Sequence, residues 1–199
     1  IIYDQIFPNQ TINLVGIFQL ENLLCAFALA HVTGVPISTL LASLSQLKSA
    51  QGRMEYIGSK NNASIFVDYA HTPDALECAL KNLRLHVKGK LWVVFGCGGN
   101  RDKGKRPQMG KFAQELADKV IVTDDNPRFE DPATIRAEIL EACPNAQEIG
   151  NRAQAIAVAI AGLNSDDILL IAGKGHETGQ TIKNVTYPFS DKDEVLKHL

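Results

Sequence analysis

The chain has 199 residues, of which 45% are hydrophobic and 21% are charged, a composition typical of a soluble globular domain. A formal net charge of -2 gives no reason to expect nucleic acid or an anionic membrane as a partner. The longest wholly apolar run, residues 23–30, is too short to span a bilayer, and no signal peptide is recognisable, so we expect a cytoplasmic protein. The cysteines form no CxxC pair, which predicts reduced thiols and no metal site.

The first 50 residues predict a helical pair without strands. An extended piece at 1–15, with a turn at 8–10, precedes apolar residues at helical spacing over 18–31, and Ser38 is expected to cap a second helix. Such a pair cannot form a core alone, so we expect it to pack on something outside this chain. Because the chain begins with Ile1 rather than Met, we interpret it as a piece of a longer protein.

From residue 52 onward the pattern changes to alternating strands and helices. Strands are expected at 54–57, 64–67, 91–95, 119–122, 148–149 and 168–171. Helices are expected at 73–87, 109–117, 133–142, 152–161 and 191–198. Several strands are continuous apolar runs, which is typical of parallel strands covered on both faces. The sequence therefore predicts a doubly wound α/β domain of about 145 residues, with a mostly parallel sheet and helices on both faces.

Polar or glycine-rich segments follow four of the predicted strands. They are Asp68–His71, Gly96–Asp102, Thr123–Arg128 and Gly173–Glu177. Because the carboxyl ends of parallel strands share one edge of a sheet, and ligands bind in the crevice there, we expect these segments to converge on a ligand. The alternative is four ordinary surface turns.

The third and fourth segments favour a zwitterionic ligand. Arg128 offers a planar fork suited to a carboxylate. Asp125 and Glu177 can accept hydrogen bonds from an ammonium group, and Asn126 can either donate or accept. The alternative is that Arg128 pairs with a neighbouring carboxylate, Asp125, Glu130 or Asp131.

Residues 99–105 mimic a phosphate-binding loop, but Arg106 stands where a Ser or Thr must reach magnesium, so we reject that motif. We interpret the segment as a flexible cationic arm near an anionic ligand. Its cations are Arg101, Lys103, Lys105 and Arg106. A solvated basic loop is the alternative.

Two histidines stand in the polar segments. His71 beside Asp68 suggests acid–base chemistry, but no Ser or Cys nucleophile motif accompanies it, and capping of the next helix is the alternative. Lys174 and His176 lie between glycines, which could let backbone N–H groups approach a carboxylate or phosphate. Glycines that only permit a tight turn are the alternative there.

Taken together, the motifs resemble those of the Mur ligases of peptidoglycan synthesis. The matching segments are Gly52–Glu55, Val67–Leu76, Val94–Gly99, Arg101–Pro107, Thr123–Arg128 and Ala172–Glu177. They occur in order from about residue 18 to the end of the chain. Within the family, the sequence is most similar to members that add meso-diaminopimelate to UDP-N-acetylmuramoyl-L-alanyl-D-glutamate.

The resemblance implies a three-domain ligase that uses ATP and Mg²⁺ to phosphorylate the glutamate carboxylate, after which an amine attacks the acyl phosphate. Residues 52–199 would be its Rossmann-like C-terminal domain, which binds the incoming amino acid. Diaminopimelate would be held by Arg101, Asp125, Asn126, Pro127, Arg128, Gly173 and Glu177. Arg53, Asp68, Tyr69 and His71 would face the nucleotide. The implied partners are diaminopimelate, ATP and the UDP-N-acetylmuramoyl-dipeptide, bound by a monomer.

The sequence differs from the family pattern in one major respect, the absence of the family's catalytic motifs. The family's phosphate-binding loop, magnesium ligands and carbamylated lysine would lie upstream of Ile1, and residues 1–51 resemble only the last helices of the central ATPase domain. We therefore expect the chain alone to be inactive. Two alternatives remain: a non-catalytic module that binds a nucleotide or an amino acid, and a folate polyglutamate ligase. The helical pair argues against the first, and the Asp-Asn-Pro-Arg sequence argues against the second.

Overall fold

A computed structural model of the chain describes residues 12–199. The turn expected at 8–10 lies outside these residues. The chain divides into two compact units, Ile1–Ser49 and Ala50–Leu199. Between residues 12 and 199, no helix is long and apolar enough to cross a membrane.

The described part of the first unit is helical. Helix α1 spans Ile17–Val32, α2 spans Ile37–Ser43, and a 3-10 turn follows at Leu44–Gln46. The helices lie where the sequence predicts them, but the expected cap is wrong. α2 begins directly after Pro36, whose φ of -62° is close to that of a helical residue. Ser38 therefore lies inside the helix and does not cap it. No residue of α1 is buried.

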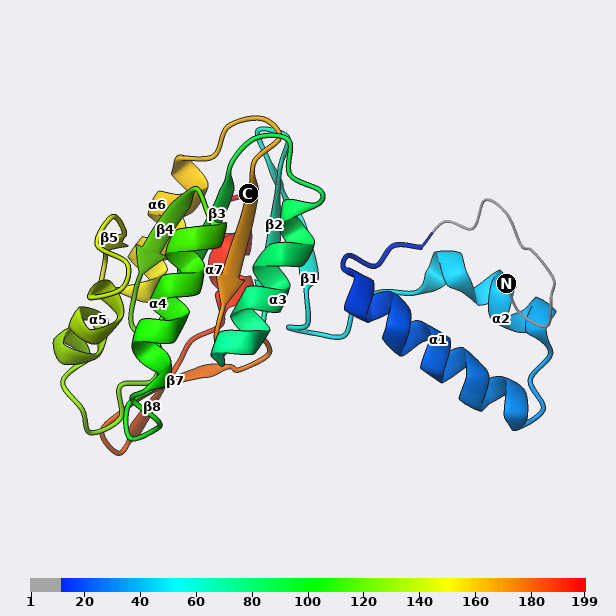
Figure 1. Cartoon of the computed structure of the whole chain (residues 1–199), viewed down its shortest axis with the longest axis horizontal. Coiled ribbons are helices and arrows are strands. Elements are labelled where there is room, and N and C mark those ends of the chain that lie inside the picture. Colours follow the sequence, from blue (N-terminus) through cyan, green and yellow to red (C-terminus); the bar gives the residue numbers. More distant parts are fainter. Residues whose placement is uncertain (1–11) are drawn as a thin grey trace. The chain divides into compact units, whose positions relative to one another are not determined.

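Six strands of the second unit form one mixed sheet (Figure 1). In chain order they are β1 (Glu55–Lys60), β2 (Ala63–Asp68), β3 (Leu91–Phe95), β4 (Lys119–Val122), β5 (Gln147–Glu148) and β6 (Ile168–Ala172). Their order across the sheet is β1-β2-β6-β3-β4-β5. β1 runs antiparallel to β2, and every other neighbouring pair is parallel.

Five helices cover the two faces of this sheet. They are α3 (Pro73–Arg84), α4 (Lys105–Leu116), α5 (Pro132–Leu140), α6 (Arg152–Ala161) and α7 (Asp191–Leu196). α4 packs against α3 and α5, whereas α6 packs against α7. Figure 1 shows α3 and α4 in front of the sheet and α6 behind it.

The direction of the chain explains this division of the helices. From β2 to β5 the crossovers advance across the sheet, but after β5 the chain returns through α6 to place β6 between β2 and β3. Crossovers are right-handed, so those running in opposite directions must lie on opposite faces. The predicted doubly wound, mostly parallel fold is therefore confirmed.

Three helices of this unit begin at caps that the sequence signals clearly. Thr72 and Asp131 accept hydrogen bonds from amides of the first turns of α3 and α5, and Asn151 does the same for α6. Pro73 and Pro132 occupy the first helical positions, where a missing N–H leaves no hydrogen bond unmade. Local chemistry therefore determines where these helices start.

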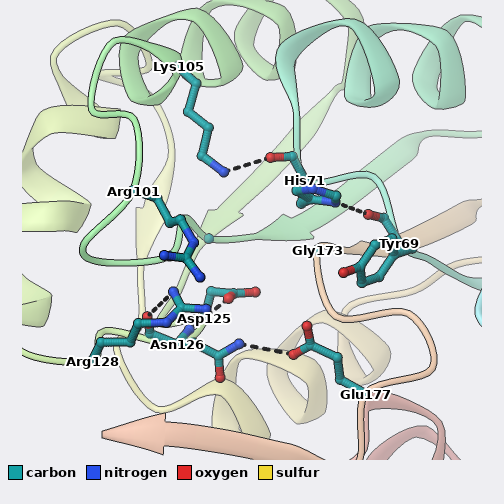
Figure 2. Close-up of a pocket in the computed structure, with 11 residues that line it drawn as sticks. Tyr69, His71, Arg101, Lys105, Asp125, Asn126, Arg128, Gly173 and Glu177 are labelled. Atoms are coloured by element: carbon teal, nitrogen blue, oxygen red, sulfur yellow. Dashed lines mark hydrogen bonds between the residues drawn. The ribbon is translucent and has the colours of Figure 1, made fainter. Parts of the chain in front are cut away.

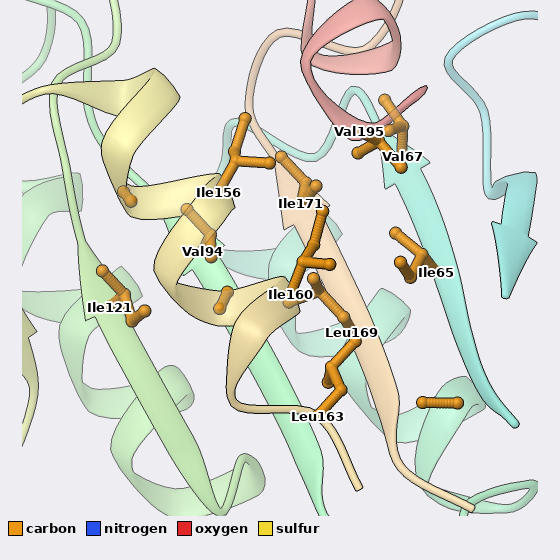
Figure 3. Close-up of a cluster of buried hydrophobic side chains, with 13 residues drawn as sticks. Ile65, Val67, Val94, Ile121, Ile156, Ile160, Leu163, Leu169, Ile171 and Val195 are labelled. Carbon is orange, nitrogen blue, oxygen red and sulfur yellow. The ribbon is translucent and has the colours of Figure 1, made fainter. Parts of the chain in front are cut away.

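One hydrophobic cluster fills the space between the sheet and α6 (Figure 3). Ile156 and Ile160 of α6 meet Leu169 and Ile171 of β6, and Val195 of α7 joins them. None of these five side chains is more than 1% exposed. Burying each contributes about 1.5–3 kcal/mol before the entropy of ordering is subtracted. This cluster holds β6 between β2 and β3.

The structure departs from the predicted elements in two places. α4 begins at Lys105 rather than at 109, because Pro107 falls in its first turn, where proline is tolerated. The segment after β6, for which no strand was predicted, forms a hairpin of β7 (Gly179–Ile182) and β8 (Val185–Pro188). Its alternating residues around a two-residue turn are a hairpin signal that the sequence reading missed.

A buried ion pair ties α6 to α7. Arg152 donates from Nε to Asp191 Oδ1 (2.6 Å) and from Nη2 to Asp191 Oδ2 (2.7 Å). Both side chains are fully buried. Arg152 Nη2 also donates to the carbonyl of Ala172, the last residue of β6 (2.9 Å). The pair therefore joins two helices to the carboxyl end of the central strand.

We expect Asp191→Asn to lower the free energy of unfolding by about 3–5 kcal/mol, because Arg152 would keep a buried charge without its counter-charge. Asp193 lies in the same first turn but is exposed, so Asp193→Asn should change stability by about 1 kcal/mol or less. Urea denaturation of the two variants measures the difference. Equal urea midpoints for Asp191→Asn and Asp193→Asn would contradict a stabilising role of the Arg152–Asp191 pair.

Candidate functional site

A pocket of about 210 Å³ opens at the carboxyl edge of the sheet. Its walls come from the segments that follow β2, β3, β4 and β6. The lining residues are Tyr69, His71, Gly96, Gly98, Arg101, Lys105, Asp125, Asn126, Arg128, Gly173 and Glu177. The four segments meet because β6 lies between β2 and β3, where the direction of the crossovers reverses.

Most residues that the sequence singles out lie in this pocket. Of those expected to hold the amino acid, Pro127 alone is not part of the lining. Of those expected to face a nucleotide, Tyr69 and His71 line the pocket, whereas Arg53 and Asp68 do not. Figure 2 shows Arg101 and Arg128 directed toward the region beside Asp125, with Tyr69 and Glu177 across the opening.

Arg128 stands in an unusual backbone conformation that the β7–β8 hairpin holds. Its φ is 50°, in the left-handed region that non-glycine residues rarely adopt. The Arg128 amide donates to the carbonyl of Thr181 (3.1 Å), and the Lys183 amide donates to the Arg128 carbonyl (2.6 Å). Because such strain persists only where the surroundings enforce it, the hairpin fixes the direction of the Arg128 side chain.

The guanidinium of Arg128 is directed at backbone oxygens rather than at a carboxylate. Nη1 donates to the carbonyl of Gly99 (2.9 Å) and, at 3.4 Å, to that of Asn126. Among residues 12–199, Arg128 forms no ion pair, so the alternative of a simple pair with Asp125, Glu130 or Asp131 is wrong. The group is held in place and keeps N–H donors for a ligand.

Asp125, Asn126 and Glu177 form the opposite, oxygen-rich wall. Asp125 is 9% exposed, and its Oδ1 accepts from the amide of Asn126 (2.7 Å). Asn126 Nδ2 donates to Glu177 Oε2 (2.9 Å). Gln180 of β7 donates to the Asp125 carbonyl (2.7 Å), so the hairpin supports this wall as well.

The predicted cationic arm is only partly correct. Arg101 and Lys105 line the pocket, and Lys105 Nζ donates to the carbonyl of His71 (2.8 Å). Arg106 is instead fully buried and pairs with Glu130 (3.0 Å) and Glu138 (2.6 Å). Its position on the inner side of the first turn of α4 turns it away from solvent. Arg106 therefore anchors the loop and does not belong to the site.

The segment after β2 presents an aromatic surface. The Arg53 guanidinium lies 4.6 Å from the centre of the Tyr69 ring, and His71 meets the same ring edge-on at 4.6 Å. His71 Nδ1 is hydrogen-bonded to the Tyr69 carbonyl (2.9 Å). Thr72 caps the following helix, so a capping role for His71 is wrong.

Asp68 serves the backbone of this segment. Its carboxylate accepts from the amides of Met54 (2.6 Å) and Ala70 (2.8 Å). Burial raises the pKa of Asp68, although the two amides oppose the shift. The carboxylate therefore joins β2 to the chain entering β1.

Gly99 allows the β3 and β4 segments to touch. A Cβ at this position would lie 2.0 Å from the carbonyl oxygen of Pro127. The Gly99 amide donates to the carbonyl of Asn126 (2.9 Å). Only a residue without a side chain permits this contact, which sets the separation between Arg101 and Arg128.

Metal ligands and the thiol of Cys97 were considered for residues 12–199. Among residues 12–199, no group of three or more His, Cys, Asp or Glu is placed to hold a metal ion. Cys97 lies beside the pocket, but burial raises the pKa of its thiol to about 12. A thiol in that state is a poor nucleophile. The polar groups that line the pocket can bind a ligand by charge and by hydrogen bonds.

Fold and pocket together define the class of protein. This is a Rossmann-like α/β domain whose binding site lies at the reversal of its crossovers and combines two guanidinium groups with two carboxylates. Such a site is complementary to a small ligand that carries both carboxylate and ammonium groups.

The chain belongs to the Mur ligase family. Residues 52–175 match the family model described as "Mur ligase, glutamate ligase domain". A protein of Chelativorans sp. strain BNC1 named UDP-N-acetylmuramoyl-L-alanyl-D-glutamate--2,6-diaminopimelate ligase is 54% identical over 199 residues, which are 100% of this chain and 40% of that protein. A protein of the same name from Bradyrhizobium diazoefficiens is 56% identical over 186 residues, or 94% of this chain and 38% of the relative. The chain thus spans about 40% of the length of such relatives.

Solved structures agree with this assignment. The solved structure of a UDP-N-acetylmuramoyl-L-alanyl-D-glutamate--2,6-diaminopimelate ligase superposes on this chain with a TM-score of 0.75 and 42% sequence identity. The match covers 94% of this chain and 39% of the solved chain. The UDP-N-acetylmuramate-alanine ligase of Thermotoga maritima shares the fold at 16% identity, with a TM-score of 0.67 and coverage of 94% and 38%. The predicted resemblance to the Mur ligases is confirmed.

Sequence reasoning missed two parts of the site. The β7–β8 hairpin, which supports Arg128 and Asp125, carried a readable alternation but was overlooked. The buried contact of Lys174 with Asn126 carried no signal, because the two residues are far apart in the sequence and only the packing of β3 between β6 and β4 brings their segments together.

We expect Gly99→Ala to destabilise the chain by about 1–3 kcal/mol, because its Cβ would force the β3 and β4 segments apart. Gly104 lies in the same loop with a φ of -61°, which alanine adopts readily, and a Cβ there would meet only the exposed Asp102 side chain, at 3.2 Å. Gly104→Ala is therefore the control and should stay within about 1 kcal/mol. Thermal unfolding compares the two. If Gly99→Ala unfolds at the same temperature as Gly104→Ala, the close contact is not needed.

A chromogenic disulfide reagent should react with two thiols of the native chain. Cys25 and Cys78 are exposed, whereas Cys97 and Cys143 are buried. Burial also raises the pKa of Cys143 to about 11, so both buried thiols are protonated as well as shielded. Cys97 and Cys143 should react with the reagent only after denaturation. Rapid modification of Cys97, located by peptide mapping, would contradict this arrangement.

Proposed function

We propose that the chain is the C-terminal part of an ATP-dependent ligase that adds meso-diaminopimelate to UDP-N-acetylmuramoyl-L-alanyl-D-glutamate in peptidoglycan synthesis. The observation that carries this proposal is the pocket, in which Arg128 forms no ion pair within the described residues and faces Asp125 and Glu177. The names of relatives that match the whole chain support the same reaction. Residues 52–199 would form the amino-acid-binding domain, and residues 1–51 the end of the central ATPase domain.

Each side of the pocket would take one part of the amino acid. Arg128, with Arg101 beside it, would bind a carboxylate of diaminopimelate. Asp125 and Glu177 would bind the ammonium group on the same carbon, near the backbone of Gly173. Held at this end, the ligand would present its other amino group to the activated glutamate. The role of these residues is to bind and orient, which is how a site raises the effective concentration of a nucleophile.

The aromatic surface after β2 fits one edge of a nucleotide. Tyr69, Arg53 and His71 would face ATP, while Asp68 would act indirectly by fixing the backbone of the segment. ATP supplies the phosphoryl group that activates the glutamate carboxylate. The described residues contain no metal cluster, so we propose that Mg²⁺ and the phosphate-binding loop belong to the rest of the ligase. A monomer working in the cytoplasm, where ATP is available, completes the proposal.

Arg128 would also decide which amino acid is accepted. Lysine resembles diaminopimelate but lacks the second carboxylate, so its binding would leave the guanidinium desolvated and without its partner. A site built around such a polar group rejects the analogue by about 10⁴-fold or more. The folylpolyglutamate synthase of Thermotoga maritima has the same fold, but at 24% identity this likeness concerns the fold alone and does not indicate the substrate of this chain.

In the full-length ligase, we expect Arg128→Ala to raise the KM for diaminopimelate by about 100-fold or more, because a charge-assisted bidentate contact is lost. The KM for ATP should stay within about twofold. Arg128→Lys is the matched control: it keeps the charge without the planar fork and should be intermediate. Steady-state kinetics of ligation measure all three enzymes.

Two results would count against the proposal. An unchanged KM for diaminopimelate in Arg128→Ala would remove Arg128 from the amino-acid site. A full-length wild-type protein that binds diaminopimelate but forms no amide bond would favour the non-catalytic binding module instead.

A further inference from the structure

Lys174 is a fully buried cation that lies behind two residues of the pocket wall, Asn126 and Glu177. Its side chain is 0% exposed, and Nζ donates to Asn126 Oδ1 (2.9 Å) and to Glu177 Oε2 (3.1 Å). The backbone around it is fixed, since the Glu177 amide donates to the Lys174 carbonyl (2.9 Å) and the Gly173 amide to the Asp68 carbonyl (3.1 Å). Burying an ammonium group costs free energy unless it is hydrogen-bonded, so the contacts with Asn126 and Glu177 fix the position of Lys174 Nζ.

Lys174 and the Thr181 amide together determine how Asn126 is oriented. Asn126 Oδ1 accepts from Lys174 Nζ and also from the amide of Thr181 in β7 (2.9 Å). A carbonyl oxygen has two lone pairs, and both are occupied. The amide nitrogen Nδ2 must then face the other way, where it donates to Glu177 Oε2. Asn126, which by its chemistry could donate or accept, is restricted to donating toward the pocket.

The same cation determines which oxygen of Glu177 is available. Oε2 already receives Lys174 Nζ and Asn126 Nδ2. Oε1 accepts no hydrogen bond from residues 12–199, and the Glu177 side chain is 33% exposed, so this oxygen is the one that can meet a ligand. The carboxylate therefore keeps one oxygen for the protein and one for an ammonium group.

We infer that Lys174 is a positioning residue for the amino-acid ligand: it restricts Asn126 to donation and leaves Glu177 Oε1 for the ligand ammonium. This inference rests on the proposed function and extends it to a residue that does not line the pocket. A lysine that only balanced the charge of Glu177 would make no difference to the orientation of Asn126.

The test is Lys174→Met in the full-length ligase. Methionine has a similar length and no donor, so Asn126 Oδ1 keeps only the Thr181 amide as a donor and Glu177 Oε2 loses a partner. The KM for diaminopimelate should rise on the order of 10- to 100-fold. The kcat and the KM for ATP should stay within about twofold. Lys81→Met removes an exposed lysine from α3 and should leave every constant unchanged.

A double-mutant cycle separates positioning from general stability. If Lys174 acts through Asn126, then adding Lys174→Met to Asn126→Ala should raise the KM for diaminopimelate by less than about threefold more. Multiplication of the two separate effects would overturn the inference. So would an unchanged KM in Lys174→Met, or equal increases in the KM for diaminopimelate and for ATP.

Asn126→Asp decides the question if Lys174→Met does not fold. This variant keeps an acceptor for Lys174 and for Thr181 but cannot donate to the pocket. We expect a lowered melting temperature, because a carboxylate oxygen then lies beside Glu177 Oε2, and a KM for diaminopimelate at least about tenfold higher in the folded variant. An unchanged KM would overturn the inference. If the wild-type ligase itself does not use diaminopimelate, the proposed function fails first, and that result is distinct from an effect of Lys174.

Discussion

The insertion of β6 between β2 and β3 is the constraint on which the rest of the structure depends. The chain builds β2 to β5 in one direction and must then cross back on the other face of the sheet. The apolar cluster under α6 and the buried pair of Arg152 with Asp191 hold the returning strand in place. The segment after β6 is thereby delivered to the loops that leave β2, β3 and β4.

Charged side chains in and around the pocket differ in how they are supported. Arg106 and Arg152 are buried and Asp124 is partly buried, and all three are paired with protein groups, so they stabilise the scaffold. Arg101 and Arg128 instead contact backbone carbonyls, which orient a guanidinium without neutralising its charge. Their charge is therefore not neutralised by a carboxylate among residues 12–199, unlike the charges of the structural ion pairs.

The β7–β8 hairpin connects fold to specificity. It forms backbone hydrogen bonds with Arg128. In addition, the Gln180 side chain donates to the Asp125 carbonyl, and the Thr181 amide donates to Asn126 Oδ1. One small element thus supports both the cationic and the anionic side of the pocket. The strained φ of Arg128 is maintained by this support, so the direction of the guanidinium does not depend on the ligand.

The sequence alone determined the mostly parallel sheet, the starts of α3, α5 and α6, and the strand-end position of the polar segments, because these follow from local periodicity and from proline. It also carried the family motifs. The tertiary structure alone decided that Arg106 is an anchor, that Asp68 serves the backbone, and that Lys174 orients Asn126 and Glu177. Those roles depend on burial and on contacts between residues distant in the chain, and a linear pattern of residue types contains neither.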